Sequence, residues 1–342
     1  MSRRYVAIAV ALSMCSILGA ATAASSRRSP QGEGGATSAH SAMAGPRQSP
    51  SGGAGQPRIV NGRVNAQAAG SLAQTFKSLV AAQPEVEWIG YAVPVDDRDR
   101  TMCCFSSADG TTWVSGTSSS SMQCCGACRI EPAADVAAAA KQGPPKPTTP
   151  PTSVRLEGSE RAVILFRIAD RKVERIRMFS EDCELDAGGR PVHWLQDVRP
   201  AESLALLESL IGPDTGRKDR VSNSAISAIA VHAEPAATSI LERLARSHAA
   251  TSIRGEAIFW LGQKAGRKAV GIISEAIEKD PETEVKKRAV FALSQLPKSE
   301  GVPLLIDVAR KNQNPAVRKQ AIFWLGQSRD PRALEFFTEI LK

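Results

Sequence analysis

Apolar positions in the second half of the chain repeat every 32 residues. From about residue 221 to the end, one column holds Ala225, Ala257, Ala289 and Ala321, and a second holds Ile229, Leu261, Leu293 and Leu325. Within one unit, Ile253, Ala257 and Leu261 are four residues apart, a spacing that places them on one face of a helix. The pattern therefore predicts helical repeats that bury a shared core by stacking.

Each repeat is predicted to contain two helices. The heptapeptide at 257–263 recurs unchanged at 321–327, and a second apolar stripe follows the first after a short break. Gly262 and Gly266 are the two candidates for the end of the first helix. The predicted units are 221–252, 253–284, 285–316 and 317–342, preceded by a helix at 202–211, within a solenoid that spans 201–342.

Residues 58–200 lack this period and predict a smaller α+β domain. Its elements follow from short apolar runs: a helix at 66–82 and strands at 87–93, 101–105, 111–115, 161–169, 172–179 and 192–195. Asp170 and Arg171 separate two of these runs and predict a hairpin turn. We expect an antiparallel sheet, interrupted by a disordered, proline-rich excursion at about 131–153.

The N-terminal residues carry targeting features. Arg3 and Arg4 precede an apolar stretch of about 16 residues, and Ala21 to Ala23 is typical of a cleavage site. The stretch is shorter than the roughly 20 residues of a spanning helix, so we expect a signal peptide at 1–23 rather than an uncut anchor. A disordered tether at 24–57 follows, and no transmembrane span is expected after cleavage. The expected location is exported, in the periplasm or outside the cell.

The net charge of +8 does not indicate a nucleic-acid partner. Residues 1–56 hold five basic and one acidic side chains, 57–200 hold 17 of each, and 201–342 hold 21 basic and 17 acidic. Half of the excess lies before residue 57, and the rest is diluted over the repeats, unlike a concentrated phosphate-binding surface.

The repeats resemble short HEAT-like repeats of the phycobilin-lyase type. The resemblance rests on Val/Ile-Arg/Lys-x-x-Ala-x-x-x-Leu with Asp/Asn-Pro before it, as found at 280–293 and 314–325. It implies an α-solenoid that binds or scaffolds other proteins. Related deoxyhypusine hydroxylases hold a metal pair with His-Glu dipeptides, but no His precedes Glu here, so that activity is not expected. Together with the Cys-rich N-terminal domain, the chain resembles a group of exported bacterial HEAT-repeat proteins.

Two sets of residues in the repeats are candidates for partner binding. The first set is a basic column with the period of the repeat, formed by Arg254, Lys286 and Arg318. It either forms a ridge for an acidic protein partner or pairs with loop acids such as Asp280. The second set is Trp260 and Trp324, which act either as binding hot spots or as fillers between stacked helices. In the C-terminal helix, Phe336 is expected in a homodimer contact or at an exposed apolar end.

The cysteines favour disulfides over a metal site. Removal of the signal peptide leaves an even number, namely Cys103, Cys104, Cys124, Cys125, Cys128 and Cys183. An oxidising compartment favours disulfides, and we expect the segment of Cys103 and Cys104 to bond the segment of Cys124 and Cys125. A zinc site and a redox centre at Cys125-x-x-Cys128 stay open as alternatives.

These observations predict a non-catalytic protein-binding or scaffolding protein of the cell envelope, without a cofactor. The alternative is a metal- or thiol-dependent enzyme or redox protein that uses the Cys-rich domain.

The disulfide prediction is checked by a thiol count on the exported protein, unfolded with and without reductant. We expect thiol titre to rise strongly on reduction and metal analysis to find no stoichiometric zinc. Six reactive thiols before reduction, together with one equivalent of zinc, would contradict the prediction.

Overall fold

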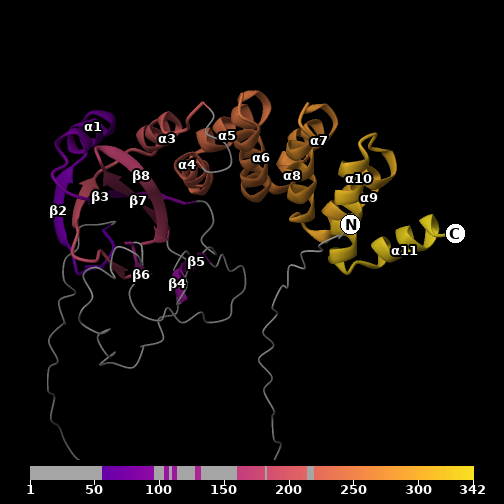
Figure 1. Ribbon diagram of the computed structural model, residues 1–342, viewed down its shortest axis with the longest axis horizontal. Helices are drawn as coiled ribbons and strands as arrows, with labels where there is room; N and C mark the ends of the chain where they lie inside the picture. Colours follow the sequence, from indigo (N-terminus) through magenta and orange to yellow (C-terminus); the bar gives the residue numbers. More distant parts are fainter. Residues whose placement is uncertain are drawn as a thin grey trace, which may run out of the picture. The chain divides into compact units, whose positions relative to one another are not determined.

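The computed structural model describes residues 56–95, 128–131, 160–181, 183–213 and 219–342, together with the backbone of strands at 104–107 and 110–113. Within these ranges a β-sheet is followed by a row of helices (Figure 1). The predicted signal peptide and nearly all of the predicted tether lie outside the described residues, as do residues 132–159 of the predicted excursion.

The main sheet has five strands and is mixed. Its order is β2 (Arg63–Ala68), β10 (Pro191–Gln196), β3 (Glu87–Pro94), β7 (Arg161–Ala169) and β8 (Lys172–Ser180). Strand β10 runs parallel to both β2 and β3, whereas β3, β7 and β8 are antiparallel. The prediction of an antiparallel sheet is therefore wrong for the β2–β10–β3 half.

A β-α-β crossover explains the parallel half. The predicted helix at 66–82 begins only at Leu72, as α1 (Leu72–Ala82), and residues 63–68 form the edge strand β2 instead. Helix α1 carries the chain from β2 to β3, and such a crossover is how consecutive parallel strands are joined. The sequence of β2 shows no alternation of apolar and polar residues, because five of its six residues are exposed and Val64 is half-buried.

The predicted hairpin is confirmed. Strands β7 and β8 pair from Ala162 with Ser180 to Ala169 with Lys172, with one register shift between Arg167 and Ile168. Asp170 and Arg171 between the strands have φ angles of 51° and 57°. Two consecutive left-handed residues are typical of a two-residue hairpin turn that follows the twist of the strands.

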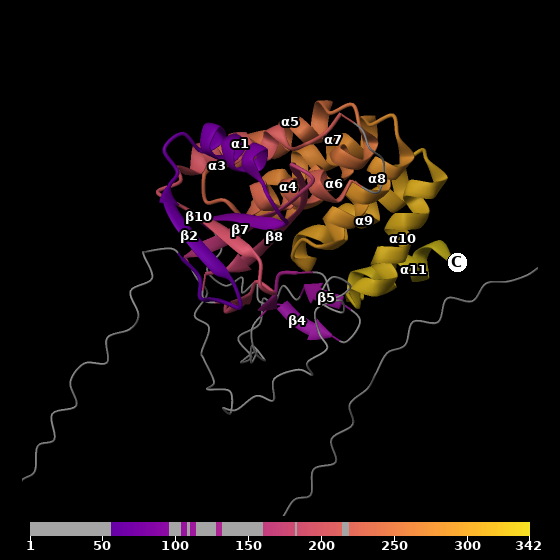
Figure 2. The same ribbon diagram turned by 60° about the vertical axis from the view of Figure 1, so that its left-hand side comes forward.

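Two smaller strand groups accompany the main sheet. Strands β1 (Ile59–Val60), β9 (Leu185–Asp186) and β6 (Cys128–Arg129) form a parallel group, and β4 (Cys104–Ser107) pairs with β5 (Gly110–Trp113). One face of the main sheet buries Trp88 and Trp194 with residues of the β1–β9–β6 group. The other face packs against α1 and the first helices that follow the sheet (Figure 2).

Glu131 joins the group under the sheet, although the predicted excursion was placed from that residue onward. Its carboxylate is 3% exposed, accepts a hydrogen bond from Trp88 Nε1 at 2.6 Å and pairs with Arg167 at 3.0 Å. A buried carboxylate with an indole and a guanidinium donor is satisfied as an ion pair and fixes the chain at this point.

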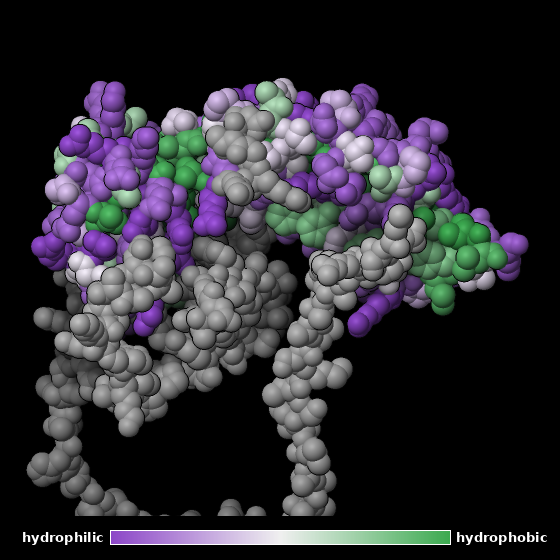
Figure 3. Space-filling model, viewed as in Figure 1, coloured by the Kyte–Doolittle hydropathy of each residue, from purple (hydrophilic) through white to green (hydrophobic). Residues whose placement is uncertain are grey.

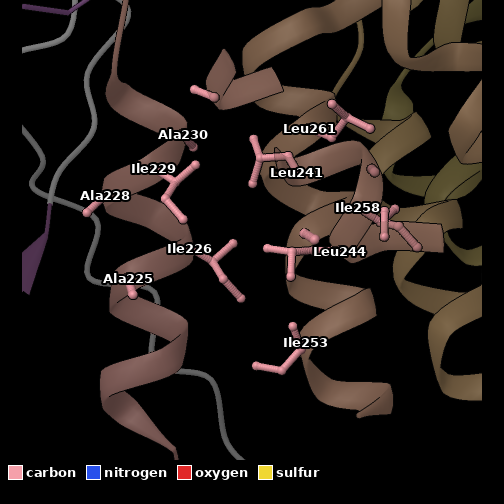
Figure 4. Close-up of a cluster of buried hydrophobic side chains, with 14 of the residues drawn as sticks. Ala225, Ile226, Ala228, Ile229, Ala230, Leu241, Leu244, Ile253, Ile258 and Leu261 are labelled. Carbon is pink, nitrogen blue, oxygen red and sulfur yellow. The ribbon is translucent and has the colours of Figure 1, made fainter. Parts of the chain in front are cut away.

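The repeat prediction is confirmed as helix pairs. Helix α3 (Pro200–Ser209) precedes the pairs α4 (Arg220–Val231) with α5 (Pro235–Ser247), α6 (Thr251–Ala265) with α7 (Val270–Lys279), α8 (Thr283–Ser294) with α9 (Lys298–Lys311), and α10 (Pro315–Ser328) with α11 (Pro331–Ile340). A 3₁₀ turn, η2 (Gly266–Ala269), separates α6 from α7. The two apolar columns of the sequence are at most 1% exposed. Figure 4 shows Ile226 and Ile229 of α4 pointing toward Leu244 and Leu241 of α5.

The helix ends follow from local residue chemistry. Gly266 has a φ angle of 50° and ends α6, whereas Gly262 stays inside the helix. Asn314 and Asp330 cap the helices that follow them, each with a proline at the first helical position. A side chain at position 262 would lie 3.3 Å from Ala292 Cβ, so Gly262 serves close packing between repeats rather than termination.

The sheet and the helices share one hydrophobic core and a buried polar chain. His232, at the end of α4, has Nδ1 2.7 Å from the Ala228 carbonyl oxygen and Nε2 2.9 Å from Ser203 Oγ. The Ser203 hydroxyl lies 2.8 Å from the hydroxyl of Tyr91 on β3. Because a carbonyl only accepts, Nδ1 carries the proton of the neutral ring, and Nε2 accepts from Ser203. The Tyr91–Ser203–His232 chain therefore ties the sheet to α3 and α4 with every ring nitrogen satisfied.

Burial keeps His232 neutral. Desolvation lowers the pKa of His232 from 6.5 to about 4, and the nearby Lys264 ammonium acts in the same direction. In the unfolded chain the imidazole takes up its proton at a higher pH than in the folded protein. The stabilising contribution of the neutral ring is therefore present above pH 6.5 and is lost as the pH falls toward 4.

His232 predicts an acid-sensitive stability. Between pH 7 and pH 5 its contribution should lower the free energy of unfolding by about 2 kcal/mol. Urea unfolding of the wild type and of His232→Gln at both pH values measures this loss. The wild type should lose more stability than the variant, and equal losses would show that His232 is protonated in the folded protein.

Candidate functional site

Arg254 of the predicted basic column is an internal side chain. It is 9% exposed and donates to both Asp280 carboxylate oxygens, at 2.8 and 3.1 Å. Its NH1 also donates to the carbonyls of His248 and Ala249, just beyond the end of α5, at 2.9 and 3.0 Å. The hydrogen bonds that Arg254 donates to Asp280 raise the pKa of Arg254. The pairing with a loop acid, one of the two sequence alternatives, is present in the structure.

Lys286 and Arg318 make the equivalent contacts in later repeats. Lys286 Nζ donates to the Glu278 carbonyl at 2.7 Å, near the end of α7. Arg318 NH1 donates to the carbonyls of Asn312 and Gln313, beyond the end of α9, at 2.8 and 3.1 Å. Carbonyls at a helix C-terminus lack partners in their own helix and attract cations. The basic column thus joins consecutive repeats, and its role as a ridge for an acidic partner stays a prediction.

The two tryptophans belong to a larger set of surface aromatics. We name this set the aromatic ladder; it consists of Phe259, Trp260, Phe291, Phe323 and Trp324 on α6, α8 and α10. Phe259 and Phe291 stack with centroids 5.6 Å apart and planes 2° apart, and Phe291 lies 4.8 Å from Trp324. The ladder therefore runs without a gap across three repeats.

Sequence reasoning missed the phenylalanine column, although Phe259, Phe291 and Phe323 share the 32-residue period. Each lies two positions after the buried alanine of its helix, which turns it away from the core. Phe323 is 52% exposed, and the other four members of the ladder are half-buried. The ladder therefore combines gap filling between helices with an accessible aromatic surface.

The two tryptophans differ in their polar contacts. Trp260 Nε1 donates to Glu256 at 2.9 Å, and the other oxygen of Glu256 accepts from Arg288 at 2.7 Å. The equivalent of Glu256 two repeats later is Gln320, and Trp324 Nε1 has no hydrogen-bond partner in the described part of the chain. Because this nitrogen is buried, its missing hydrogen bond costs folding free energy, whereas Trp260 carries no such cost.

The C-terminal helix exposes a different set of residues from the expected one. Phe336 is 3% exposed and lies under the Arg310 guanidinium, 5.6 Å from its ring centroid, so it is a core residue. Leu334, Ile340 and Leu341 are instead exposed by 68%, 51% and 85%. Figure 3 shows the resulting hydrophobic surface over α11. The homodimer contact stays a prediction.

The cysteines are described only in part. Cys128 and Cys183 are both buried in the core beneath the sheet, beside Leu185. Cys104 opens β4, while Cys103, Cys124 and Cys125 lie outside the described residues. Among the described side chains, no group of three His, Cys, Asp or Glu residues could hold a metal ion. None of the described helices has the length and hydrophobicity needed to cross a bilayer.

A family model of HEAT repeats matches residues 270–342. This part of the chain therefore contains HEAT repeats. No curated protein matches it. Among solved structures it is similar to YibA of Escherichia coli, at 19% identity and a TM-score of 0.30, over 42% of this chain and 54% of that one. It is also similar to human deoxyhypusine hydroxylase in complex with glycerol, at 19% identity and a TM-score of 0.30, over 36% and 43%. The match spans about half the length of each of these two proteins. HEAT repeats commonly mediate protein interactions.

Because Arg254 binds a buried carboxylate between repeats, its substitution should cost more folding stability than substitution of the equivalent Arg318. Arg254→Met leaves Asp280 without its guanidinium in a site that is 7% exposed, which should destabilise the protein by about 3 kcal/mol or more. The equivalent Arg318→Met removes only carbonyl contacts and should cost about 1 kcal/mol. Denaturant unfolding followed by circular dichroism measures both, and equal costs would contradict the internal role of Arg254.

Proposed function

We propose that this HEAT-repeat protein is a non-catalytic scaffold that docks a protein partner on the aromatic ladder. The observation that carries the proposal is the continuous, partly accessible aromatic surface across three repeats. Tryptophan and other aromatic side chains supply much of the binding energy in protein interfaces, because they bury a large area at a small cost in conformational entropy.

The surroundings of the ladder support a protein partner. The Glu256–Arg288 ion pair borders Trp260, and Lys287 pairs with Glu284 at 3.0 Å on the middle helix of the three. Interfaces of soluble partners typically have an aromatic centre and a polar rim.

We also propose that the protein acts in the cell envelope after export, in the periplasm or outside the cell. This proposal rests on the signal-peptide pattern at 1–23 and the polar tether at 24–57. Sequencing of the N-terminus of the protein recovered from the envelope fraction tests it, since cleavage should leave Ala24 as the first residue.

Truncation of the ladder should weaken partner binding. A photo-crosslinking residue at position 323 identifies the partner in cells, and calorimetry with the purified partner then compares variants. Phe323→Ala should weaken binding about 30-fold, the effect of a hot spot worth about 2 kcal/mol. Leu334→Ala is the matched control, because Leu334 is an exposed apolar residue outside the ladder.

An unchanged dissociation constant for Phe323→Ala, in a protein with wild-type unfolding behaviour, would remove the ladder from the proposal. An equal loss for Leu334→Ala would assign binding to the C-terminal helix instead.

A further inference from the structure

A second surface, separate from the aromatic ladder, lies where the sheet meets the first helices. A groove of about 690 Å³ opens between α1, α3 and the β7–β8 hairpin. We name it the α1–α3 groove. Phe76 and Val80 of α1, Leu206 and Leu210 of α3, and Val173 of the hairpin supply most of its apolar lining. Figure 3 shows hydrophobic surface over α3, beside the polar surface of α1.

The lining positions show that the groove runs along both helices. On α1 they are 73, 76, 77 and 80, and on α3 they are 202, 205, 206, 209 and 210. This is the spacing of one helical face, so each helix presents a whole face to the groove. The α1 face spans about 10 Å at 1.5 Å per residue. A third helix of two to three turns has the length and the ridges to lie in such a groove.

The rim of the groove is basic. Lys77, Arg171 and Lys172 line it with exposed side chains, and none of the three makes an ion pair in the described part of the chain. Glu202 is the acidic residue in the lining, but Arg199 binds both of its carboxylate oxygens, at 2.8 and 3.1 Å. The pKa of Glu202 is lowered by these hydrogen bonds. An occupant of the groove therefore meets three uncompensated positive charges around an apolar floor.

We infer that the α1–α3 groove binds a short, acidic, amphipathic helix of a partner protein. The apolar floor accepts one apolar helix face, and the rim cations pair with Asp or Glu beside that face. The site does not depend on the ladder: the ladder is on α6, α8 and α10, whereas the groove is built by α1, α3 and the hairpin.

The probe is a set of fluorescein-labelled 14-residue peptides with Leu at positions 4, 7, 8 and 11 and Glu at the flanking positions. One control set replaces Glu by Lys, and a second scrambles the leucines. Fluorescence anisotropy with the full-length protein should show saturable binding of the acidic set. The Lys set should bind at least tenfold more weakly, and the scrambled set should not saturate.

Charge reversal locates the binding. Lys77→Glu with Lys172→Glu should weaken acidic-peptide binding at least tenfold at low salt, and less at high salt because salt screens exposed charges. Lys268→Glu with Lys319→Glu changes the net charge equally, at exposed lysines outside the groove, and should leave binding unchanged. Hydrogen exchange should slow in 72–82 and 200–210 when the peptide is bound.

Several outcomes would overturn the inference. They are a complete absence of saturable binding, equal affinity for the acidic and basic sets, and equal loss in the two double variants. Displacement of the peptide by dodecanoate would assign the groove to a small amphiphile, and tighter binding to anionic vesicles than to any peptide would assign it to a membrane. Phe323→Ala should not change peptide binding, which separates failure of this inference from failure of the proposed ladder.

Discussion

Close approach of neighbouring first helices is the constraint on which the repeat half of the protein depends. The column Ala225, Ala257, Ala289 and Ala321 is fully buried, and a larger side chain there would push neighbouring helices apart. Glycine is needed where even the Cβ atom of alanine would clash. A Cβ atom at Gly301 would lie 2.4 Å from the Leu293 carbonyl oxygen. Large aromatic side chains have no room at these alanine positions. The aromatic residues of the first helices therefore lie on the outer face, where they form the ladder.

Packing between repeats also explains why a basic residue recurs with the period of the core. Arg254, Lys286 and Arg318 recur with the same period as the core residues, and each binds carbonyls near the end of the preceding helix. The second helix of a repeat ends with carbonyls that lack partners in their own helix, and from Arg254 onward a cation of the next repeat binds them. In the first repeat this position is Ser222. A periodic charge is therefore a feature of the joints between repeats. Residues that break the period, such as Gln320 in place of Glu256, are better indicators of a special surface.

The sequence predicts those elements whose burial produces a regular pattern. The repeat helices have one fully buried stripe each, and the β7–β8 hairpin has two apolar runs around a turn, so both could be recognised. Strand β2 is an exposed edge strand with Val64 half-buried, so no strand is predicted there, and its residues 66–68 fall within the predicted helix at 66–82. The parallel half of the sheet is missed for this reason. The α1–α3 groove could not be predicted, because its two helices are far apart in the sequence. Strands β3 to β10 separate α1 from α3 along the chain, and only folding brings the two helices together. The ladder could have been found from Phe259, Phe291 and Phe323.

The Tyr91–Ser203–His232 chain connects elements that lie next to the two surfaces. Ser203 lies on α3, which lines the groove, and His232 ends α4, which packs against α6 with Phe259 and Trp260. The backbone adds to this connection, since Val95 pairs with His232 and the Ala233 N–H donates to the Pro94 carbonyl at 3.0 Å. A fully satisfied buried polar network has one favoured arrangement and resists deformation. Binding at one site changes the affinity of another site only when the elements between the two sites can adopt two arrangements. The chain therefore favours one packing of α3 and α4 against the sheet, and it is this packing that would present the two proposed surfaces.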